Sequence, residues 1–486
     1  MNKLSWERLK FYFLIVLIMT SILQVGILWS YQDYGFPINF FGRNTVPEDI
    51  SDEHAAKSLF LPFRIVLSEG SGDSDKDEPS RWIIGNNKDT DYIKLWGETK
   101  QYLKNSLSIS QKPSLMSISE WGRLAIQERV VIFEFKTVVG QNLYSWLLDV
   151  DSISNDSPKE VFKIMVAPWQ NSGMLYISDN VKVYAYNLSI DEKNLIGYED
   201  IINRYSGNND KNLRKYNFFK EFDPKSKHRN NFSDDVLVIT KGQYSNIKDA
   251  YSNIPERLNV PKTYTQEQVD QIASAVLGAG KDGYDRTIDS SNNSIEFKTQ
   301  NKIYKLYKNG YLEYKYLTEI QESDKGEIKE ALVNTYRLLN GIKALVSEES
   351  SVYLSGIRAS KGAYLFDFDY MVDGIPITFI YQEAGQDMVK PAITVEANSK
   401  DVLSCTAYLK SFEQENTESV YNVYFSEMLD ELYKNYKEFK NDKTTEIKDI
   451  RISYSVKANQ ASQQIRPVWV LETSDKKFIV PMHLKQ

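Results

Sequence analysis

Histidine and cysteine, the side chains that most often carry out catalysis or bind transition metals, are scarce and scattered in this sequence. The three histidines, His54, His228 and His483, lie far apart, and the single cysteine, Cys405, has no basic residue next to it. Neither an HExxH nor a GxSxG motif is present, so zinc proteases and serine hydrolases lack their usual signatures. The sequence predicts no catalytic residue, no metal ligand and no cofactor site.

Two acidic arrangements could nevertheless do chemistry. The stretch Asp73–Asp77 places carboxylates at alternate positions, as calcium loops do, but Glu78 stands where such a loop needs its turn glycine. A solvated acidic loop is the better interpretation, and weak divalent-cation binding is the alternative. Asp367 and Asp369 share one face of a predicted strand and could act as acid and base. Such pairs also arise by chance among 66 acidic residues, so a structural role is favoured.

One segment near the N-terminus, residues 11–31 (FYFLIVLIMTSILQVGILWSY), carries no charge. At about 1.5 Å per residue it spans roughly 31 Å as a helix, which is the thickness of a hydrocarbon core. No small-x-small cleavage site follows it, so we predict an uncleaved transmembrane helix. Lys3, Arg8 and Lys10 precede the span, and the positive-inside rule therefore places the N-terminus in the cytoplasm and everything from Asp33 onward outside.

Polar and small side chains give this helix a face that a second helix could recognise. Ser21, Gln24 and Leu28 fall on one stripe, and Gly26 with Ser30 forms a small-xxx-small pair on an adjacent stripe. A glutamine amide in hydrocarbon gains from a partner across a helix interface, and small residues permit close approach. We predict a partner helix interface at Ser21, Gln24, Gly26 and Leu28; an ordinary anchor that tolerates one polar residue is the alternative.

The composition of the remaining chain is that of a folded ectodomain. Hydrophobic residues make up 42% and aromatic residues 13% of the 486 residues, and the 32 tyrosines favour half-buried sheet. The net charge of -7 has the wrong sign for binding a phosphate backbone, so nucleic-acid binding is not expected. A single cysteine excludes intramolecular disulfides, and Cys405, in an apolar strand-like run, is expected to be buried and inert.

The pattern of elements predicts an α+β fold, in which a single N-terminal transmembrane helix precedes a multi-domain ectodomain of antiparallel sheets with helices packed on one face. Runs such as VVIFEF and VFKIMVAP indicate strands, and amphipathic stretches such as Tyr92 to Leu107 indicate helices. We expect the following parts: a cytoplasmic tail (1–10), the transmembrane helix (11–31), a stalk (32–57), an N-terminal α+β domain (58–225), a middle helix-plus-hairpin domain (226–345) and a C-terminal α+β region (346–486).

Local signals place several boundaries in the C-terminal half. Thr265 and Gln268 form a predicted capping box at a helix start, and Gly341 is expected to close the next helix. Asn309-Gly310 predicts a type I′ hairpin. Ser426 is the expected N-cap of the last long helix.

The order of these parts resembles the YycH family of Gram-positive bacteria, and the C-terminal half is also similar to the YycI family. The resemblance covers nearly the whole chain. It is carried by the basic tail and span, LPFRIV, VFKIMVAPW, the NGYLEY hairpin, the FDYMVDGIP turn and PVW at 467–469.

The resemblance implies an accessory regulator of a two-component system: a single-pass membrane protein with an extracellular domain that associates with a membrane sensor histidine kinase and adjusts signalling to cell-wall metabolism. A YycI-like protein is a further partner that it suggests. The residues alone leave two alternatives open, an extracellular module that binds a ligand or wall fragment, and, with less support, a cell-wall hydrolase.

Overall fold

The structure is a computed structural model, and the residues that it describes all fall within one compact unit. It describes residues 52–71, 80–108, 112–150, 152–168, 173–188, 192–207, 214–222, 231–241, 244–255, 258, 265–277, 284–289, 294–318, 321–343, 350–383, 386–441 and 446–485. The predicted transmembrane segment 11–31, the interface residues proposed on it and the acidic loop Asp73–Asp77 lie outside these ranges. Within them, no helix is both long and apolar enough to cross a bilayer.

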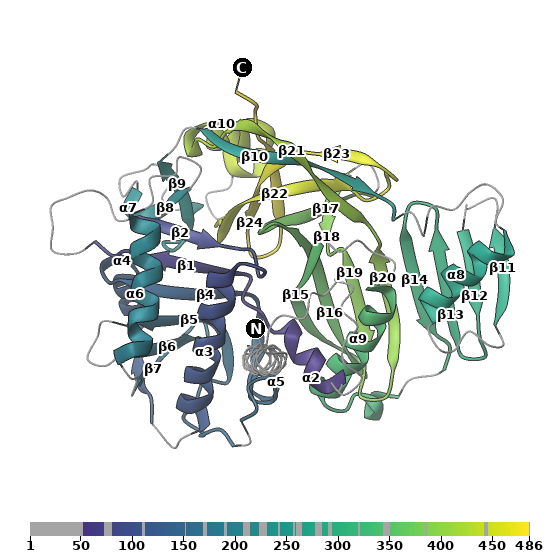
Figure 1. Ribbon diagram of the computed structural model, residues 1–486, viewed down its shortest axis with the longest axis horizontal. Coiled ribbons are helices and arrows are strands. Elements are labelled where there is room, and N and C mark those ends of the chain that lie inside the picture. The colour runs from purple at the N-terminus through teal and green to yellow at the C-terminus, as the bar shows by residue number, and fades with distance from the viewer. Residues whose placement is uncertain are drawn as a thin grey trace, which may run out of the picture. The chain divides into compact units, whose positions relative to one another are not determined.

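The first part of the chain forms a nine-stranded antiparallel sheet in the order β3-β7-β6-β5-β4-β1-β2-β8-β9 (Figure 1). Apolar runs such as VVIFEF supply its central strands, which are buried on both sides. The strands are β1 (Arg64–Ser68), β2 (Arg81–Ile84), β3 (Ser114–Met116), β4 (Val130–Gly140), β5 (Glu160–Ala167), β6 (Met174–Ser178), β7 (Val183–Asn187), β8 (Lys215–Phe218) and β9 (Leu237–Lys241). β9 lies beyond residue 225, where we expected the N-terminal domain to end.

Helices cover both faces of this sheet, so the prediction that they pack on one face is wrong here. On one face, Trp121 of α4 packs in a cluster with Ile132 of β4. The next residue of that strand, Phe133, points to the opposite face and its ring lies 5.7 Å from that of Trp96 on α3. The helices of this part are α3 (Thr90–Ser108), α4 (Ile118–Gln127), α5 (Gln141–Leu147), α6 (Glu192–Ser206) and α7 (Phe219–Phe222).

A second sheet of 13 strands runs through the C-terminal half in the order β11-β12-β13-β14-β20-β19-β16-β17-β22-β24-β25, with β15 on β16 and β18 on β17. It is antiparallel apart from the parallel pair β17 and β22, so the predicted α+β class with antiparallel-dominated sheets is confirmed. Its strands are β11 (Asp285–Asp289), β12 (Ser294–Lys298), β13 (Lys302–Tyr307), β14 (Tyr311–Tyr316), β15 (Ser350–Ser360), β16 (Ala363–Val372), β17 (Ile375–Glu383), β18 (Gln386–Lys390), β19 (Ile393–Ala397), β20 (Val402–Tyr408), β22 (Asp449–Lys457), β24 (Pro467–Glu472) and β25 (Lys477–Pro481).

A third, three-stranded sheet is assembled from distant parts of the chain. β10 (Tyr244–Asn253) lies between β21 (Ser411–Asn422) and β23 (Gln463–Ile465). Phe412 of β21 is fully buried, and its ring lies 5.3 Å from that of Tyr370 and 6.5 Å from that of Phe379 in the second sheet. Aromatic packing therefore holds the third sheet against the second.

The remaining helices confirm some of the predicted boundaries and correct others. The capping box is confirmed: Gln268 N donates to Thr265 Oγ1 at 3.3 Å, and Thr265 N donates to Gln268 Oε1 at 3.0 Å. The N-cap of α10 is Tyr424, and Ser426 lies inside the first turn, so that prediction was wrong. The helices are α2 (Asp52–Ala56), η1 (Lys57–Leu59), α8 (Gln266–Leu277), η5 (Glu322–Asp324), α9 (Ile328–Lys343), α10 (Phe425–Asn435) and α11 (Lys437–Asn441).

Three backbone details also differ from, or refine, the sequence-based expectations. α9 continues through Gly341 to Lys343, because that glycine has no positive φ with which to end the helix. Gly310 has a φ of +81°, whereas Asn309 is not among the positive-φ residues, so the hairpin is not type I′. A three-residue loop ending in a left-handed glycine fits instead. At the end of the predicted stalk, α2 buries Ala55 and Ala56 and contacts α9.

Candidate functional site

Charged side chains gather where the first sheet meets strands β22 and β24 of the second. Basic and acidic members are equal in number, and their side chains are 7–24% exposed, apart from Asp235 at 46%. Burial of charge on this scale requires close pairing. We call this set the charged cluster: Arg64, Glu134, Lys136, Lys163, Asp235, Asp449, Arg451 and Glu472.

The centre of the charged cluster links the two sheets. Asp449 lies 3.1 Å from Arg64, 3.1 Å from Lys136 and 2.5 Å from Arg451. Glu472 lies 2.5 Å from Lys136 and 2.7 Å from Arg451. Because Arg64 and Lys136 come from β1 and β4, and their acidic partners from β22 and β24, the ion pairs fix one sheet against the other.

A second arm of the cluster extends along the first sheet. Glu134 on β4 pairs with Arg64 and, at 3.0 Å, with Lys163 on β5. Lys163 continues to Asp235 at 2.7 Å. The ring of Phe63 lies beside the cluster, 5.3 Å from Lys136 and within 6 Å of both arginines, which places an aromatic face against several cations.

The charged cluster should make the free energy of unfolding fall as the pH becomes acidic. Burial opposes ionisation of Glu134, but Arg64 and Lys163 outweigh it and lower the pKa of Glu134 from 4.5 to about 2. A carboxylate with a lowered pKa stabilises the fold above its unfolded pKa, and this contribution is lost as the pH falls toward the folded pKa. We expect Glu134 to contribute on the order of 3 kcal/mol at pH 7 and to lose it between about pH 4.5 and pH 2. Urea denaturation across this range would measure it.

The control is Glu134→Gln, which removes the titrating group. Its free energy of unfolding should fall less steeply with pH over that interval than that of the unaltered protein. Parallel pH profiles for the two proteins would contradict the proposed role of Glu134.

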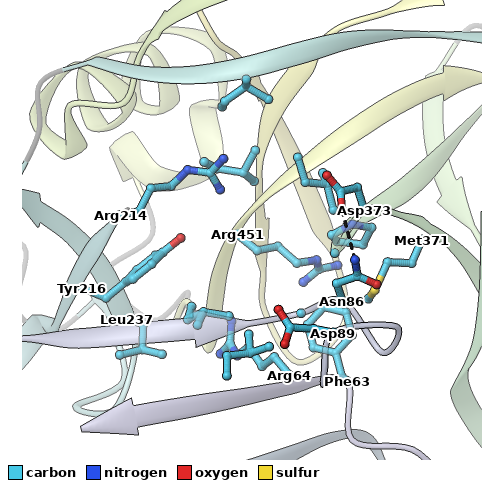
Figure 2. A pocket seen from close by; sticks show the side chains of 18 of the residues that line it. Phe63, Arg64, Asn86, Asp89, Arg214, Tyr216, Leu237, Met371, Asp373 and Arg451 are labelled. Atoms are coloured by element: carbon cyan, nitrogen blue, oxygen red, sulfur yellow. Dashed lines mark hydrogen bonds between the residues drawn. The ribbon is translucent and has the colours of Figure 1, made fainter. Parts of the chain in front are cut away.

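Beside the charged cluster lies a cavity of about 460 Å³, shown in Figure 2. Strands of all three sheets contribute to its walls. Apolar and polar side chains share the wall, and the polar side chains include arginine, lysine, asparagine and aspartate. The lining residues used below are Phe63, Ile83, Leu237, Ile247, Met371, Ile450 and Trp469 on the apolar side and Arg64, Asn86, Asp89, Arg214, Lys248, Asp373, Glu418 and Arg451 on the polar side.

This composition is suited to binding a small molecule. A cavity lined by both apolar side chains and converging polar groups can hold a small molecule that has an apolar and a polar part. The structure therefore offers a cavity beside the charged cluster that is suited to binding.

Two loops from different sheets meet at one wall of the cavity. The turn Asp373-Gly374 joins β16 to β17, and both residues have positive φ values, 46° and 76°. Asn86, which follows β2, donates from Nδ2 to Asp373 Oδ1 at 3.0 Å (Figure 2). A Cβ on Gly85 would lie 2.6 Å from the carbonyl oxygen of Gly374. The two backbones touch, and only glycine leaves the room that this contact needs.

Gly85→Ala should therefore destabilise the protein by about 1–3 kcal/mol, because the new methyl group must push the two loops apart. Gly122→Ala is the matched control. A Cβ on Gly122 has open space around it, and replacing a glycine within helix α4 should stabilise by up to about 1 kcal/mol. Urea denaturation should show that the free energy of unfolding falls in Gly85→Ala and rises in Gly122→Ala. An unchanged free energy of unfolding in Gly85→Ala would mean that the contact between the two loops is not tight.

The two acidic residues that the sequence singled out, Asp367 and Asp369, are held by hydrogen bonds within the protein. Asp367 accepts hydrogen bonds from Arg358 at 2.7 Å and Thr394 at 2.8 Å. Asp369 accepts one from the backbone of Ala392 at 3.0 Å, so both acids are engaged. No group of three or more histidine, cysteine, aspartate or glutamate side chains suited to a metal occurs in the described ranges.

Two other sequence candidates can be placed. Cys405 is buried in β20 as expected, and burial raises the pKa of its thiol to about 12, which favours the inert protonated form. His54 and His483 lie in separate places, at α2 and near the C-terminus, while His228 falls outside the described ranges.

Sequence analysis missed the charged cluster. The sequence did contain a sign of it: single charged residues stand within apolar strands, such as Glu134 in VVIFEFK and Arg451 in DIRISY. Which of these charges pair could not be read from the sequence, because the partners come from strands far apart in the chain.

Comparison with known proteins supports the fold. No protein-family model and no curated protein matches the sequence. Among solved structures, the crystal structure of YycH from Bacillus subtilis matches with a TM-score of 0.55, covering 87% of this chain and 95% of that chain at 14% sequence identity. The resemblance to YycH predicted from the sequence is thus confirmed at the level of the fold.

Proposed function

We propose, from the fold shared with YycH, that this chain is a membrane-anchored extracellular accessory protein that regulates a sensor histidine kinase of a two-component system linked to cell-wall metabolism. The observation that supports it is the fold match over nearly the whole of both chains. In this proposal the protein is not an enzyme, its N-terminus is cytoplasmic, and its folded part lies outside the cell. A YycI-like protein is a second proposed partner.

Contact through the membrane is the proposed route of regulation. Residues 11–31 would form the anchor, and Ser21, Gln24, Gly26 and Leu28 would face a helix of the kinase. Small residues allow close approach, and the amide of Gln24 gains a partner in hydrocarbon. A helix that binds one signalling state of the kinase more tightly than the other shifts the kinase toward that state, and only this difference in affinity matters.

The test is co-purification of the full-length protein with the kinase after Gln24→Leu. Loss of an interhelical hydrogen bond of roughly 1 kcal/mol should weaken the association about fivefold and change signalling. Gln24→Asn, which keeps the amide, should lose less, and Val16→Leu, which lies on none of the stripes that carry the four interface residues, should have no effect. Unchanged co-purification together with unchanged signalling in Gln24→Leu would count against the proposal.

A second candidate function is an extracellular module that binds a ligand or wall fragment, and the cavity beside the charged cluster favours it. The two functions differ in what the anchor must do. Replacing residues 11–31 with an unrelated transmembrane helix should abolish regulation if helix contact is central. Regulation that survives this exchange would favour the ligand-binding module.

A further inference from the structure

We propose that the cavity beside the charged cluster binds a small anion with an apolar body, that is, an aliphatic chain bearing a carboxylate or phosphate head group. This inference stands on the cavity alone and does not depend on the proposed function. Its volume of about 460 Å³ falls within the range of ligand-binding pockets in proteins.

The apolar body would lie against the apolar side chains of the wall. Strands of the first sheet contribute Ile83 and Leu237, and strands of the second contribute Ile450 and Trp469. Removing apolar surface from water on both sides would stabilise an aliphatic chain there. Met371, which is 4% exposed, lies in the same lining and offers a single methyl group close to any occupant.

The head group would be bound by basic side chains that have unused hydrogen-bonding capacity. Arg451 is 8% exposed, and its buried Nε has no hydrogen-bond partner among the described residues. Buried donors in proteins are nearly always paired, so an orphan donor in a cavity wall points to a missing acceptor. Arg214 donates from Nε to Ser245 at 3.0 Å, and neither it nor Lys248 has an ion pair within the described part of the chain. Figure 2 shows Arg214 and Arg451 among the side chains around the cavity.

Three acidic side chains also line the cavity, and their surroundings decide the sign of the ligand. Asp89 Oδ1 accepts from the backbone of Asp91 at 2.7 Å at the start of α3, where the helix N-terminus stabilises its charge. Asp373 accepts from Asn86. Glu418 is exposed. The three acids are thus hydrogen-bonded or in contact with water. Among the described lining residues, the buried polar atom without a partner is a donor, Arg451 Nε, so the partner that is missing is an acceptor.

The test uses the full-length protein in lipid nanodiscs with ¹³C-methyl-labelled methionine. The Met371 signal is assigned by its disappearance in Met371→Leu. Hexanoate and hexyl phosphate are titrated as probes, with hexanol and hexylammonium as the neutral and cationic counterparts. We expect a saturable shift of the Met371 signal with at least one anion, and binding at least about tenfold weaker for hexanol and hexylammonium. The relative affinities of the two anions identify the preferred head group.

Variants locate the binding to the cavity. The double substitution Arg214→Gln and Lys248→Gln should weaken binding of the anion about tenfold or more, since both groups are charged donors. Ile83→Trp should fill the apolar part and abolish the shift. Lys298→Gln, an exposed lysine on β12, is the matched control and should bind normally.

Three results would overturn the proposal: no saturable shift with either anion, equal binding of hexanol or hexylammonium, or unchanged anion binding in the double variant. Thermal unfolding of each variant is measured in parallel, so that a loss of binding counts only in a folded protein. A loss of kinase association with Gln24→Leu would leave these results untouched, so the two proposals fail independently.

Discussion

Replacing Asp449 with asparagine is expected to lower the free energy of unfolding by about 3–5 kcal/mol. Asp449 contacts Arg64, Lys136 and Arg451, all with side chains no more than 12% exposed. Burial raises the pKa of Asp449, but these three cations outweigh it and hold the pKa well below its usual value, so Asp449 is charged in the folded protein. The asparagine side chain can donate or accept hydrogen bonds but leaves three buried positive charges with one fewer counter-charge.

Urea denaturation of the full-length protein at pH 7 measures this effect. Asp234→Asn is the matched control, because Asp234 pairs with Lys220 at 2.7 Å but its side chain is 62% exposed. Exposed ion pairs contribute little, so the control should lose less than about 1 kcal/mol. Similar losses for the two variants would show that the charged cluster does not hold the sheets together.

The second large effect is expected for Phe412→Ala, at about 3–5 kcal/mol. The Phe412 side chain is fully buried between the third and second sheets, where it packs on Tyr370 and Phe379. Removing its ring leaves a cavity at the aromatic contact that joins β21 to the second sheet. Denaturation monitored by intrinsic fluorescence would report the loss.

The control for this prediction is Tyr251→Ala on the neighbouring strand β10. Tyr251 is 43% exposed, and its removal should change stability by less than about 1 kcal/mol. If Phe412→Ala were as mild as this control, the third sheet would owe its position to hydrogen bonding with β10 and not to aromatic packing.

Helices with strong local signals were predicted well. The amphipathic stretch Tyr92 to Leu107 became α3, and the Thr265–Gln268 capping box formed as expected, because both depend on residues within a few positions of one another. Boundaries that depend on packing were less predictable. Gly341 could end a helix, yet α9 continues past it. Ser426 is a residue type suited to an N-cap, but it lies two residues after the N-cap that the structure shows, Tyr424.

Side-chain alternation in β4 was visible in the sequence, but its consequence was not. VVIFEF presents apolar residues on both faces, which requires a covering layer on each. The sequence did not reveal that α4 supplies one layer and α3 the other, since this depends on where the connections run in space.

The sequence by itself determined the amphipathic elements, the antiparallel α+β character and the resemblance to YycH, because these follow from short-range periodicity and from the order of segments. The tertiary structure alone decided the charged cluster and the cavity. Arg64 and Asp449 lie near opposite ends of the described chain, and their pairing depends on the packing of two sheets whose strands are ordered by long-range hydrogen bonds. Charges within apolar strands must find partners when buried, but only the folded arrangement of the strands selects which ones.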